Sequence, residues 1–150
     1  MSEVAILVGL PGAGKTSFYR ARLAESHVQV SKDVIGHGKD AGRRQLVLVT
    51  DALRAGRSVA VDNTNARAED RAPLIALGRA AGARVVAYVL DTTPKESAAR
   101  NRTRTGRERV PNVAVFVTAK RLQPPTAAEG FDAVYRVHAE GGAFEVVVER

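Results

Sequence analysis

Short apolar runs alternate along this chain with longer stretches in which apolar residues recur every three or four positions. The short runs are rich in β-branched residues, which is typical of strands that are buried on both faces of a sheet. The longer stretches have the spacing of amphipathic helices, as where Leu46, Val49 and Leu53 fall on one face. The predicted strands are Val4–Gly9, His27–Val30, Ser58–Asp62, Arg84–Leu90, Tyr135–His138 and Phe144–Val148, and the predicted helices are 16–26, 39–55, 67–81, 94–103 and 112–122.

Strands that alternate with helices predict an α/β fold whose parallel sheet is covered by helices on both faces. We expect the polar turn 63–65 and Asn112 to cap the helices that follow them. Ligands of such folds bind beyond the carboxyl ends of the strands. That edge of the sheet would bring together residues 9–16, Asp33 and residues 62–65.

The most specific motif of the chain is a glycine-rich stretch between the first strand and the first helix. It reads Gly9-Leu10-Pro11-Gly12-Ala13-Gly14-Lys15-Thr16 and fits the spacing of a phosphate-binding loop. Its backbone N–H groups would surround phosphate oxygens, Lys15 would reach the β- and γ-phosphates, and the Thr16 hydroxyl would bind Mg²⁺. The residues expected to bind ATP are Gly9, Pro11, Gly12, Ala13, Gly14, Lys15, Thr16 and Ser17.

Positive charge is concentrated in one segment of the chain. The formal net charge is +7, and the segment from Arg100 to Arg121 carries seven Lys and Arg residues against the single acid Glu108. Such clustering suits an anionic partner, either nucleotide phosphates or the backbone of a nucleic acid. A solvated basic face explains the charge run equally well.

Length and composition set the broad class. We expect 150 residues to form a single domain, 1–150. Cysteine is absent, which excludes disulfides and thiol chemistry, and nothing in the composition argues for an oxidising compartment. The apolar runs are of strand length and the start of the chain lacks a signal-peptide pattern, so we expect a cytoplasmic protein with no membrane partner. The sequence gives no indication of oligomeric state.

The remaining motifs narrow the kind of nucleotide chemistry. An Asn-Lys-x-Asp motif that would read guanine is absent, and Asp62 is followed by Asn63, so the Asp-Glu pair of many ATPases is missing. Asp33 follows the second strand, where a kinase needs a carboxylate to orient an acceptor hydroxyl and accept its proton. Taken alone, Asp33 is better explained as a helix cap or a surface acid.

The arginines bear on the same question. Arg100 and Arg104 are four residues apart and share a helix face, and Arg107 and Arg109 follow in a loop. A lid over about residues 100–111 would close on the triphosphate and bring arginine to the charge that phosphoryl transfer develops. An exposed, arginine-rich helix end is the alternative interpretation.

Several stretches, taken together, resemble the kinase domain of the polynucleotide kinase/phosphatase family, which phosphorylates 5′-hydroxyl ends. Besides the phosphate loop, the resemblance is carried by Val30-Ser31-Lys32-Asp33, Val59-Ala60-Val61-Asp62-Asn63-Thr64-Asn65, Arg100-Asn101-Arg102-Thr103-Arg104, Val110-Pro111 and Pro124-Pro125-Thr126-Ala127-Ala128-Glu129-Gly130-Phe131. They occur in the family's order and span about residues 4–137. The Asp-Asn-Thr-Asn turn and the Pro-Pro-Thr element are the most specific of them.

The resemblance implies a P-loop NTPase fold of the adenylate-kinase-like type, with strand order 2-3-1-4-5. By the same resemblance, Asp33 matches the general base, Lys15 and Thr16 the phosphate and Mg²⁺ ligands, and Arg104 the lid arginine, assisted by Arg100. It implies further that Asp62 supports the metal through water. In this family pattern the acceptor side is shaped by Asp33, Asp62, Asn63, Thr64 and Asn65.

Two departures from the family pattern concern the acceptor. Ser31-Lys32 stands before the catalytic Asp where the family often has Asn-Arg, and Gly36 stands where phage members carry an arginine. The leading hypothesis is an ATP-dependent kinase of 5′-hydroxyl ends of DNA or RNA, with ATP and Mg²⁺ as cofactors. The alternatives are a P-loop kinase of a small metabolite or nucleoside, and a nucleotide-dependent ATPase or binding protein.

Overall fold

A computed structural model describes residues 2–32, 40–103, 110–140 and 142–149 of the chain. The strands are β1 (Glu3–Val8), β2 (His27–Val30), β3 (Ser58–Asp62), β4 (Arg84–Leu90), β5 (Ala133–Glu140) and β6 (Ala143–Val148). The helices are α1 (Lys15–Phe18), α3 (Ala41–Arg54), α4 (Ala68–Ala80), α5 (Pro94–Arg102) and α6 (Asn112–Arg121), with a π-helical turn η1 (Tyr19–Leu23) and a 3₁₀ turn η3 (Ala127–Glu129).

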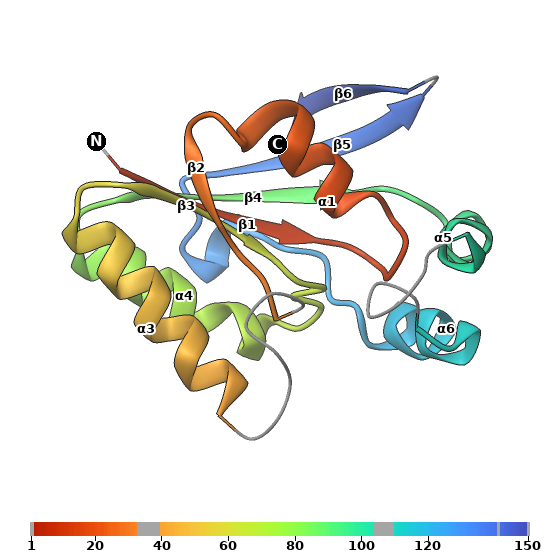
Figure 1. Ribbon diagram of the computed structural model, residues 1–150, viewed down its shortest axis with the longest axis horizontal. Coiled ribbons are helices and arrows are strands. Elements are labelled where there is room, and N and C mark those ends of the chain that lie inside the picture. The colour runs from red at the N-terminus through yellow and green to blue at the C-terminus, as the bar shows by residue number, and fades with distance from the viewer. Residues whose placement is uncertain (1, 33–39, 104–109, 141, 150) are drawn as a thin grey trace.

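The six strands form one sheet in the order β2-β3-β1-β4-β5-β6 (Figure 1). The first five strands of that order are parallel, and β6 pairs with β5 in the antiparallel direction. The predicted order 2-3-1-4-5 and the predicted hairpin at the C-terminal end of the chain are thereby confirmed. β1 lies in the middle of the sheet, so every side chain from Val4 to Val8 is fully buried.

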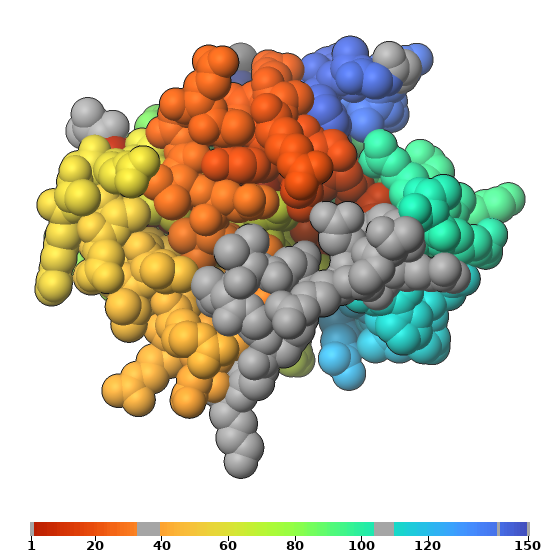
Figure 2. Space-filling view, in the orientation of Figure 1, coloured from red at the N-terminus to blue at the C-terminus, as the bar shows by residue number. Residues whose placement is uncertain are grey.

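Alternate residues of the central strands face two separate cores. Val4 and Ile6 pack with Val49 of α3 and Leu74 of α4 on one face of the sheet. On the other face Ala5 and Leu7 pack with apolar residues of α1, η1, α5 and α6. Figure 1 shows α3 and α4 beneath the sheet, with α5 and α6 beyond the ends of the strands. On the side of the molecule that the space-filling view shows, α1 and β2 lie in the upper middle, with α3 on the left and α5 and α6 on the right (Figure 2).

The first helix differs from the prediction. The sequence predicts one helix over 16–26, but the α-helical part ends at Phe18 and continues as a π-helical turn, in which Ala24 N–H donates to the Tyr19 carbonyl. The wider turn keeps Tyr19 and Leu23 buried against the sheet. The Tyr19 hydroxyl donates to the His27 carbonyl at 2.6 Å and so fixes the entry into β2.

Two predicted helix caps are wrong. α4 is preceded by Arg67, and Asn65, which was expected in the capping turn, instead adopts a positive φ of 45°. The Asn65 amide donates to the Leu7 carbonyl at 2.7 Å, so it joins strand ends and caps no helix. Asn112 is the first residue of α6, with Pro111 before it, and its Oδ1 accepts a hydrogen bond from Asn101.

In the part of the chain that the structure describes, no helix combines the length and the apolar character that crossing a bilayer requires.

Candidate functional site

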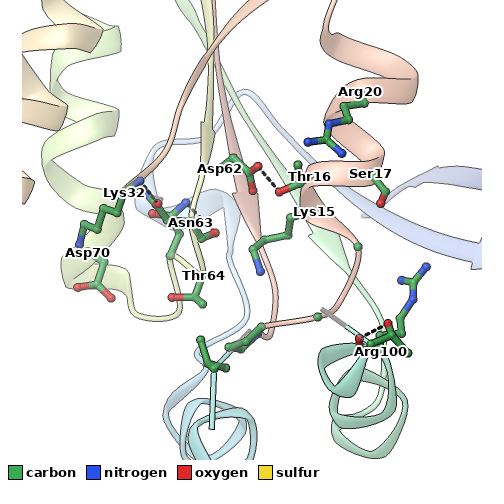
Figure 3. Close-up of a pocket in the computed structure, with 16 residues that line it drawn as sticks. Lys15, Thr16, Ser17, Arg20, Lys32, Asp62, Asn63, Thr64, Asp70 and Arg100 are labelled. Atoms are coloured by element: carbon green, nitrogen blue, oxygen red, sulfur yellow. Dashed lines mark hydrogen bonds between the residues drawn. The ribbon is translucent and has the colours of Figure 1, made fainter. Parts of the chain in front are cut away.

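A cavity of about 550 Å³ opens at the carboxyl ends of the parallel strands. The phosphate loop forms its floor between β1 and α1, and Lys32 follows β2 on one side. Figure 3 shows Lys32, Asn63, Thr64 and Asp70 to one side of Lys15, with Ser17, Arg20 and Arg100 to the other. The topology therefore gathers residues from five parts of the sequence at one edge, as ligand sites in this fold class require.

The phosphate loop depends on two glycines. Gly12 and Gly14 have positive φ values of 82° and 102°, which L side chains rarely adopt. A Cβ at Gly12 would also collide with the Ser97 carbonyl, and one at Gly14 would lie 2.6 Å from the guanidinium of Arg100. Both glycines thus allow the loop to turn and allow α5 to pack directly against it.

Lys15 lies within the curve of the loop. Its Nζ donates to the carbonyl oxygens of Gly9 at 3.0 Å and Leu10 at 2.8 Å, and the residue is 9% exposed. The ammonium group is thus held by the backbone of the same loop whose N–H groups would bind phosphate. This placement suits a residue that neutralises phosphate charge.

Thr16 and Asp62 form a polar pair in the same cavity as Lys15. The Thr16 hydroxyl donates to Asp62 Oδ2 at 2.7 Å (Figure 3). Gln29 Nε2 donates to the same oxygen at 2.9 Å. Asp62 is only 4% exposed, so these two donors compensate the carboxylate for its loss of water. Gln29 is absent from the predicted site, although it lies on the short strand β2, one residue before the strand ends at Val30.

The pair is suited to Mg²⁺. Hydroxyl and carboxylate oxygens are the donors this ion prefers, and it usually keeps several waters and takes other ligands from substrate phosphates. Within the described residues no three His, Cys, Asp or Glu side chains gather into a metal site. Thr16 and Asp62 would therefore hold a hydrated ion against a bound phosphate.

The turn after β3 is hydrogen-bonded to three other parts of the chain. Asn63 Oδ1 accepts from the Lys32 backbone N–H at 2.9 Å, and its Nδ2 donates to Gln45 of α3. The Thr64 carbonyl accepts from Gly9 N–H, the first residue of the phosphate loop, at 3.1 Å. The acceptor side predicted from the sequence is therefore bonded directly to the nucleotide side.

Arg100 of α5 reaches the opposite rim. Its Nη1 donates to the Ala13 carbonyl at 3.0 Å, and the Thr92 hydroxyl donates to the same oxygen at 3.0 Å. The fully buried Asn101 pairs with the backbone of Val110, donating to its carbonyl at 2.5 Å and accepting from its N–H at 3.0 Å. This pairing joins the chain near the two ends of the predicted lid, residues 100–111.

The structure brings together most of the predicted site residues but does not describe all of them. Pro11, Gly12, Gly14, Lys15, Thr16, Ser17, Arg100 and residues 62–65 line the cavity. Asp33, Gly36, Arg104, Arg107 and Arg109 lie outside the described residues, so the general base and the lid arginine stay predictions.

Three charged residues of the cavity were missed by the sequence reasoning. They are Arg20, Lys32 and Asp70. Arg20 follows Thr16 by four residues, and that helical spacing could have placed it on the same side of the helix. Lys32 belongs to the stretch before Asp33 that carries the family resemblance, but that resemblance assigns it no role. Asp70 has no local sequence signal that distinguishes it from a surface acid.

Comparison with known proteins gives one family match. A model of the AAA_33 family, an AAA domain, matches residues 4–125. The Arabidopsis thaliana protein transcription factor bHLH140 is 34% identical over 142 residues, which make up 87% of this chain and 15% of that protein. The bifunctional polynucleotide phosphatase/kinase of Schizosaccharomyces pombe is 24% identical over 139 residues, 90% of this chain and 33% of that protein. The chain thus spans a third or less of either relative.

Solved structures agree on the fold. Kti12 of Chaetomium thermophilum in complex with ADP-AlF3 has a TM-score of 0.67 at 13% identity, covering 90% of this chain and 88% of that one. A gluconokinase from Sinorhizobium meliloti has a TM-score of 0.65 at 18% identity, covering 93% and 85%. A fungal RNA kinase has a TM-score of 0.65 at 16% identity, covering 91% and 38%. These similarities confirm the predicted P-loop NTPase fold.

Proposed function

This chain belongs to the AAA_33 family, and from that premise we propose that it is an ATP-dependent kinase of nucleic-acid 5′-hydroxyl ends. The phosphate loop would bind the triphosphate, and the turn 62–65 with the end of β2 would receive the acceptor. Both parts lie in one cavity, so donor and acceptor would meet without a large rearrangement.

The observation that carries the proposal is the bonding between strand ends around Lys15. Thr16 is bonded to Asp62, and the next residue, Asn63, accepts a hydrogen bond from Lys32 N–H at 2.9 Å. Lys32 directly precedes Asp33 in the sequence. The predicted base therefore follows a backbone position that is tied to the same edge as the phosphate loop, which is where a general base for phosphoryl transfer is needed.

In the proposed reaction the acceptor hydroxyl oxygen bonds to the γ-phosphorus, and the bond from that phosphorus to the β–γ bridging oxygen breaks. The hydroxyl proton passes to the Asp33 carboxylate, and ADP leaves with the bridging oxygen. Lys15 and Arg100 would neutralise charge on the phosphate oxygens, with Arg104 as a further arginine. Thr16 and Asp62 would hold Mg²⁺, which would supply electrostatic stabilisation of the charge on the phosphates.

The positive charge of the cavity and the similarity to known proteins both favour a nucleic acid as the acceptor. Arg20 and Lys32 line the cavity in addition to Lys15 and Arg100, so cations extend beyond the positions that a triphosphate needs. Two similar proteins, the fission-yeast polynucleotide phosphatase/kinase and the fungal RNA kinase, are named for acceptors of this class. A small-molecule kinase is the second candidate, because a cavity of about 550 Å³ also has the usual size of a metabolite pocket.

The proposal is tested by incubating the protein with γ-labelled ATP and a panel of acceptors. The panel contains 5′-hydroxyl DNA and RNA oligonucleotides, their 5′-phosphorylated counterparts, nucleosides and small sugars. We expect label on the 5′-hydroxyl oligonucleotides and none on the 5′-phosphorylated ones. Label on sugars or nucleosides alone would favour the second candidate, and ATP turnover without any labelled acceptor would favour an ATPase or binding protein.

A further inference from the structure

Arg71 is a charged side chain with no access to solvent. It lies on α4 beneath the turn that follows β3, and it is 0% exposed. All three nitrogens of its guanidinium donate: Nε to Glu129 Oε1 at 2.8 Å, Nη2 to Glu129 Oε2 at 3.0 Å and Nη1 to the Asn65 carbonyl at 2.8 Å. A buried guanidinium is tolerated only with such complete pairing, and the two-pronged contact fixes its orientation.

Glu129 is itself held in place by the element that carries it. Its Oε2 also accepts from Thr126 N–H at 2.9 Å, at the start of η3. Gly130 ends η3 with a φ of 112°, and a Cβ there would come within 3.1 Å of Ile75 of α4. The 3₁₀ turn is thus packed against α4, and the carboxylate is aimed at Arg71.

The other end of this chain of contacts is the acceptor side of the cavity. Asn65 has a φ of 45°, a conformation that costs energy for a residue with a side chain, although Asn tolerates it better than most. Its carbonyl is held by Arg71 and its amide by the Leu7 carbonyl. The preceding residue, Thr64, lines the cavity and accepts from Gly9 N–H.

From these contacts we infer that Arg71 and Glu129 are positioning residues that set the acceptor side of the active site, through Asn65, from outside the cavity. This inference rests on the proposed function for its meaning in catalysis. It also gives a structural role to the Pro-Pro-Thr…Glu-Gly-Phe element, which follows α6 and contains Glu129. Neither Arg71 nor Glu129 lines the cavity.

α4 offers a matched control for the test. Arg79, two turns further along the same helix, also pairs with a carboxylate: its Nη1 donates to both oxygens of Asp132, at 3.1 and 3.0 Å, and its Nη2 donates to the Gly130 carbonyl. Both partners of this ion pair are partly exposed, and neither lines the cavity. The test compares Arg71→Lys with Arg79→Lys. Each change keeps the positive charge and removes the planar fork.

The first readout needs no catalysis. Hydrogen exchange of the Gly9 amide, measured by NMR, reports how often its bond to the Thr64 carbonyl opens, and the amides of the central strand β1 report global unfolding. In Arg71→Lys we expect Gly9 to exchange at least tenfold faster while the β1 amides keep their protection. In Arg79→Lys we expect Gly9 exchange within twofold of the original protein.

The second readout separates the acceptor from the nucleotide. In Arg71→Lys we expect KM for the oligonucleotide to rise at least fivefold, and Kd for an unreactive ATP analogue to stay within twofold. Glu129→Gln serves as a second variant with the same expectations for KM and Kd. Its Gly9 exchange is compared with that of its own β1 amides, because this substitution also lowers global stability. Unchanged Gly9 exchange and KM in both variants, or equal changes in Arg79→Lys, would overturn the inference. If the original protein labels no acceptor at all, the proposed function fails, while the exchange rates still decide whether Arg71 positions the turn.

Discussion

Asp62 illustrates how a single residue is prepared for a charged ligand. Its carboxylate is nearly without solvent, but Thr16 and Gln29 both donate to the same oxygen, Oδ2. The group thus stays hydrogen-bonded, and a bound cation could take over the contact that Thr16 now makes. A carboxylate held in this way needs little reorganisation when the cation binds, and that favours both affinity and rate.

The first residue-scale prediction concerns the general base. Asp33→Asn keeps the size of the side chain but removes the group that accepts the hydroxyl proton, so we expect transfer of label to fall by about 10²–10⁴-fold. ATP binding should be nearly unchanged, because the phosphate loop is intact. Transfer rates and the Kd of an ATP analogue check this. Asp40→Asn, at the start of α3, is the control, and full activity in Asp33→Asn would rule out the assignment.

The second residue-scale prediction uses a pair of glycines. Gly12→Ala forces a side chain into a left-handed conformation and against the Ser97 carbonyl, so we expect a loss of stability of about 2–4 kcal/mol and weaker ATP binding. Gly42→Ala lies in α3 with nothing within 4 Å of the new Cβ. There we expect a gain of about 0.5–1 kcal/mol. Urea unfolding of both variants measures the difference, and equal effects would contradict the packing of α5 on the loop.

Single residues were predictable where a local motif specifies them. Lys15 and Thr16 follow from the spacing of the phosphate loop, and the structure places both in the cavity. Arg71 could not be found in this way, because its partner Glu129 is 58 residues distant and an arginine on a helix normally faces solvent. Its importance depends on tertiary contacts that no local pattern encodes.

Among the elements, β3 and β4 were predicted better than the helix caps, whereas the predicted strand Tyr135–His138 covers only the middle of β5. Ser58–Asp62 and Arg84–Leu90 match β3 and β4, since short β-branched runs in a parallel sheet have clear limits. The caps of α4 and α6 and the π-helical turn η1 were missed. Whether a side chain caps a helix depends on which backbone group it bonds to in the folded protein. The Asn65 amide donates to the Leu7 carbonyl of β1 and not to the backbone of α4.

An element-scale prediction concerns the end of α5. Asn101→Ala leaves the N–H and carbonyl of Val110 without their side-chain partner, in a place where the asparagine is fully buried. We expect a loss of about 1–3 kcal/mol in the free energy of unfolding. Arg102→Ala, at the exposed neighbouring position, should change it by less than about 0.5 kcal/mol. Denaturant titration of both variants checks this, and a loss confined to Arg102→Ala would contradict it.

A second element-scale prediction concerns pH and η3. Burial raises the pKa of Glu129, but hydrogen bonds from Arg71 and from Thr126 N–H outweigh it, so the pKa lies below its ordinary value of 4.5. The unfolded chain therefore takes up the proton first as pH falls. The stability that ionised Glu129 provides is present above pH 4.5 and is lost as pH falls through the lower, folded-state value.

The measurement is the unfolding free energy of Glu129→Gln against the original protein from pH 7 to pH 3. We expect a difference of about 3–5 kcal/mol at pH 7, because the substitution leaves the buried Arg71 without its counter-charge. This difference in unfolding free energy should become smaller as the pH falls toward 3. A difference that stays constant over this range would mean that the ionised carboxylate does not stabilise the fold.

Over the whole molecule, charge is distributed unevenly and bears on the choice of partner. The net charge is +7, and cationic side chains from η1, from the end of β2 and from α5 meet at one cavity. A polyanion would release counterions along this surface, whereas a small acceptor would release few. Salt dependence therefore reports the class of acceptor.

The whole-molecule prediction follows from this. Between 50 and 200 mM salt we expect KM for a 5′-hydroxyl oligonucleotide to rise by about tenfold or more, with a slope of roughly −0.7 per neutralised phosphate in a log–log plot of affinity. KM for a nucleoside acceptor should change by less than about threefold, since it offers no phosphate to the basic residues. Steady-state kinetics at four salt concentrations distinguish the two. The same salt dependence of KM for the oligonucleotide and the nucleoside would indicate that the basic residues interact only with ATP.

The contact between Gly12 and α5 has a consequence for how the two substrates affect each other. Arg100 and Thr92 hold the Ala13 carbonyl, and Gly12 touches the backbone of the helix at Ser97, so α5 rests on the loop that would grip the nucleotide. A shift of the loop on nucleotide binding would therefore act on α5 and, through the bond from Gly9 N–H to the Thr64 carbonyl, on the turn 62–65. Thermodynamic reciprocity then requires that an acceptor favoured by ATP tightens ATP by the same factor, so the order in which the substrates arrive leaves their joint affinity unchanged.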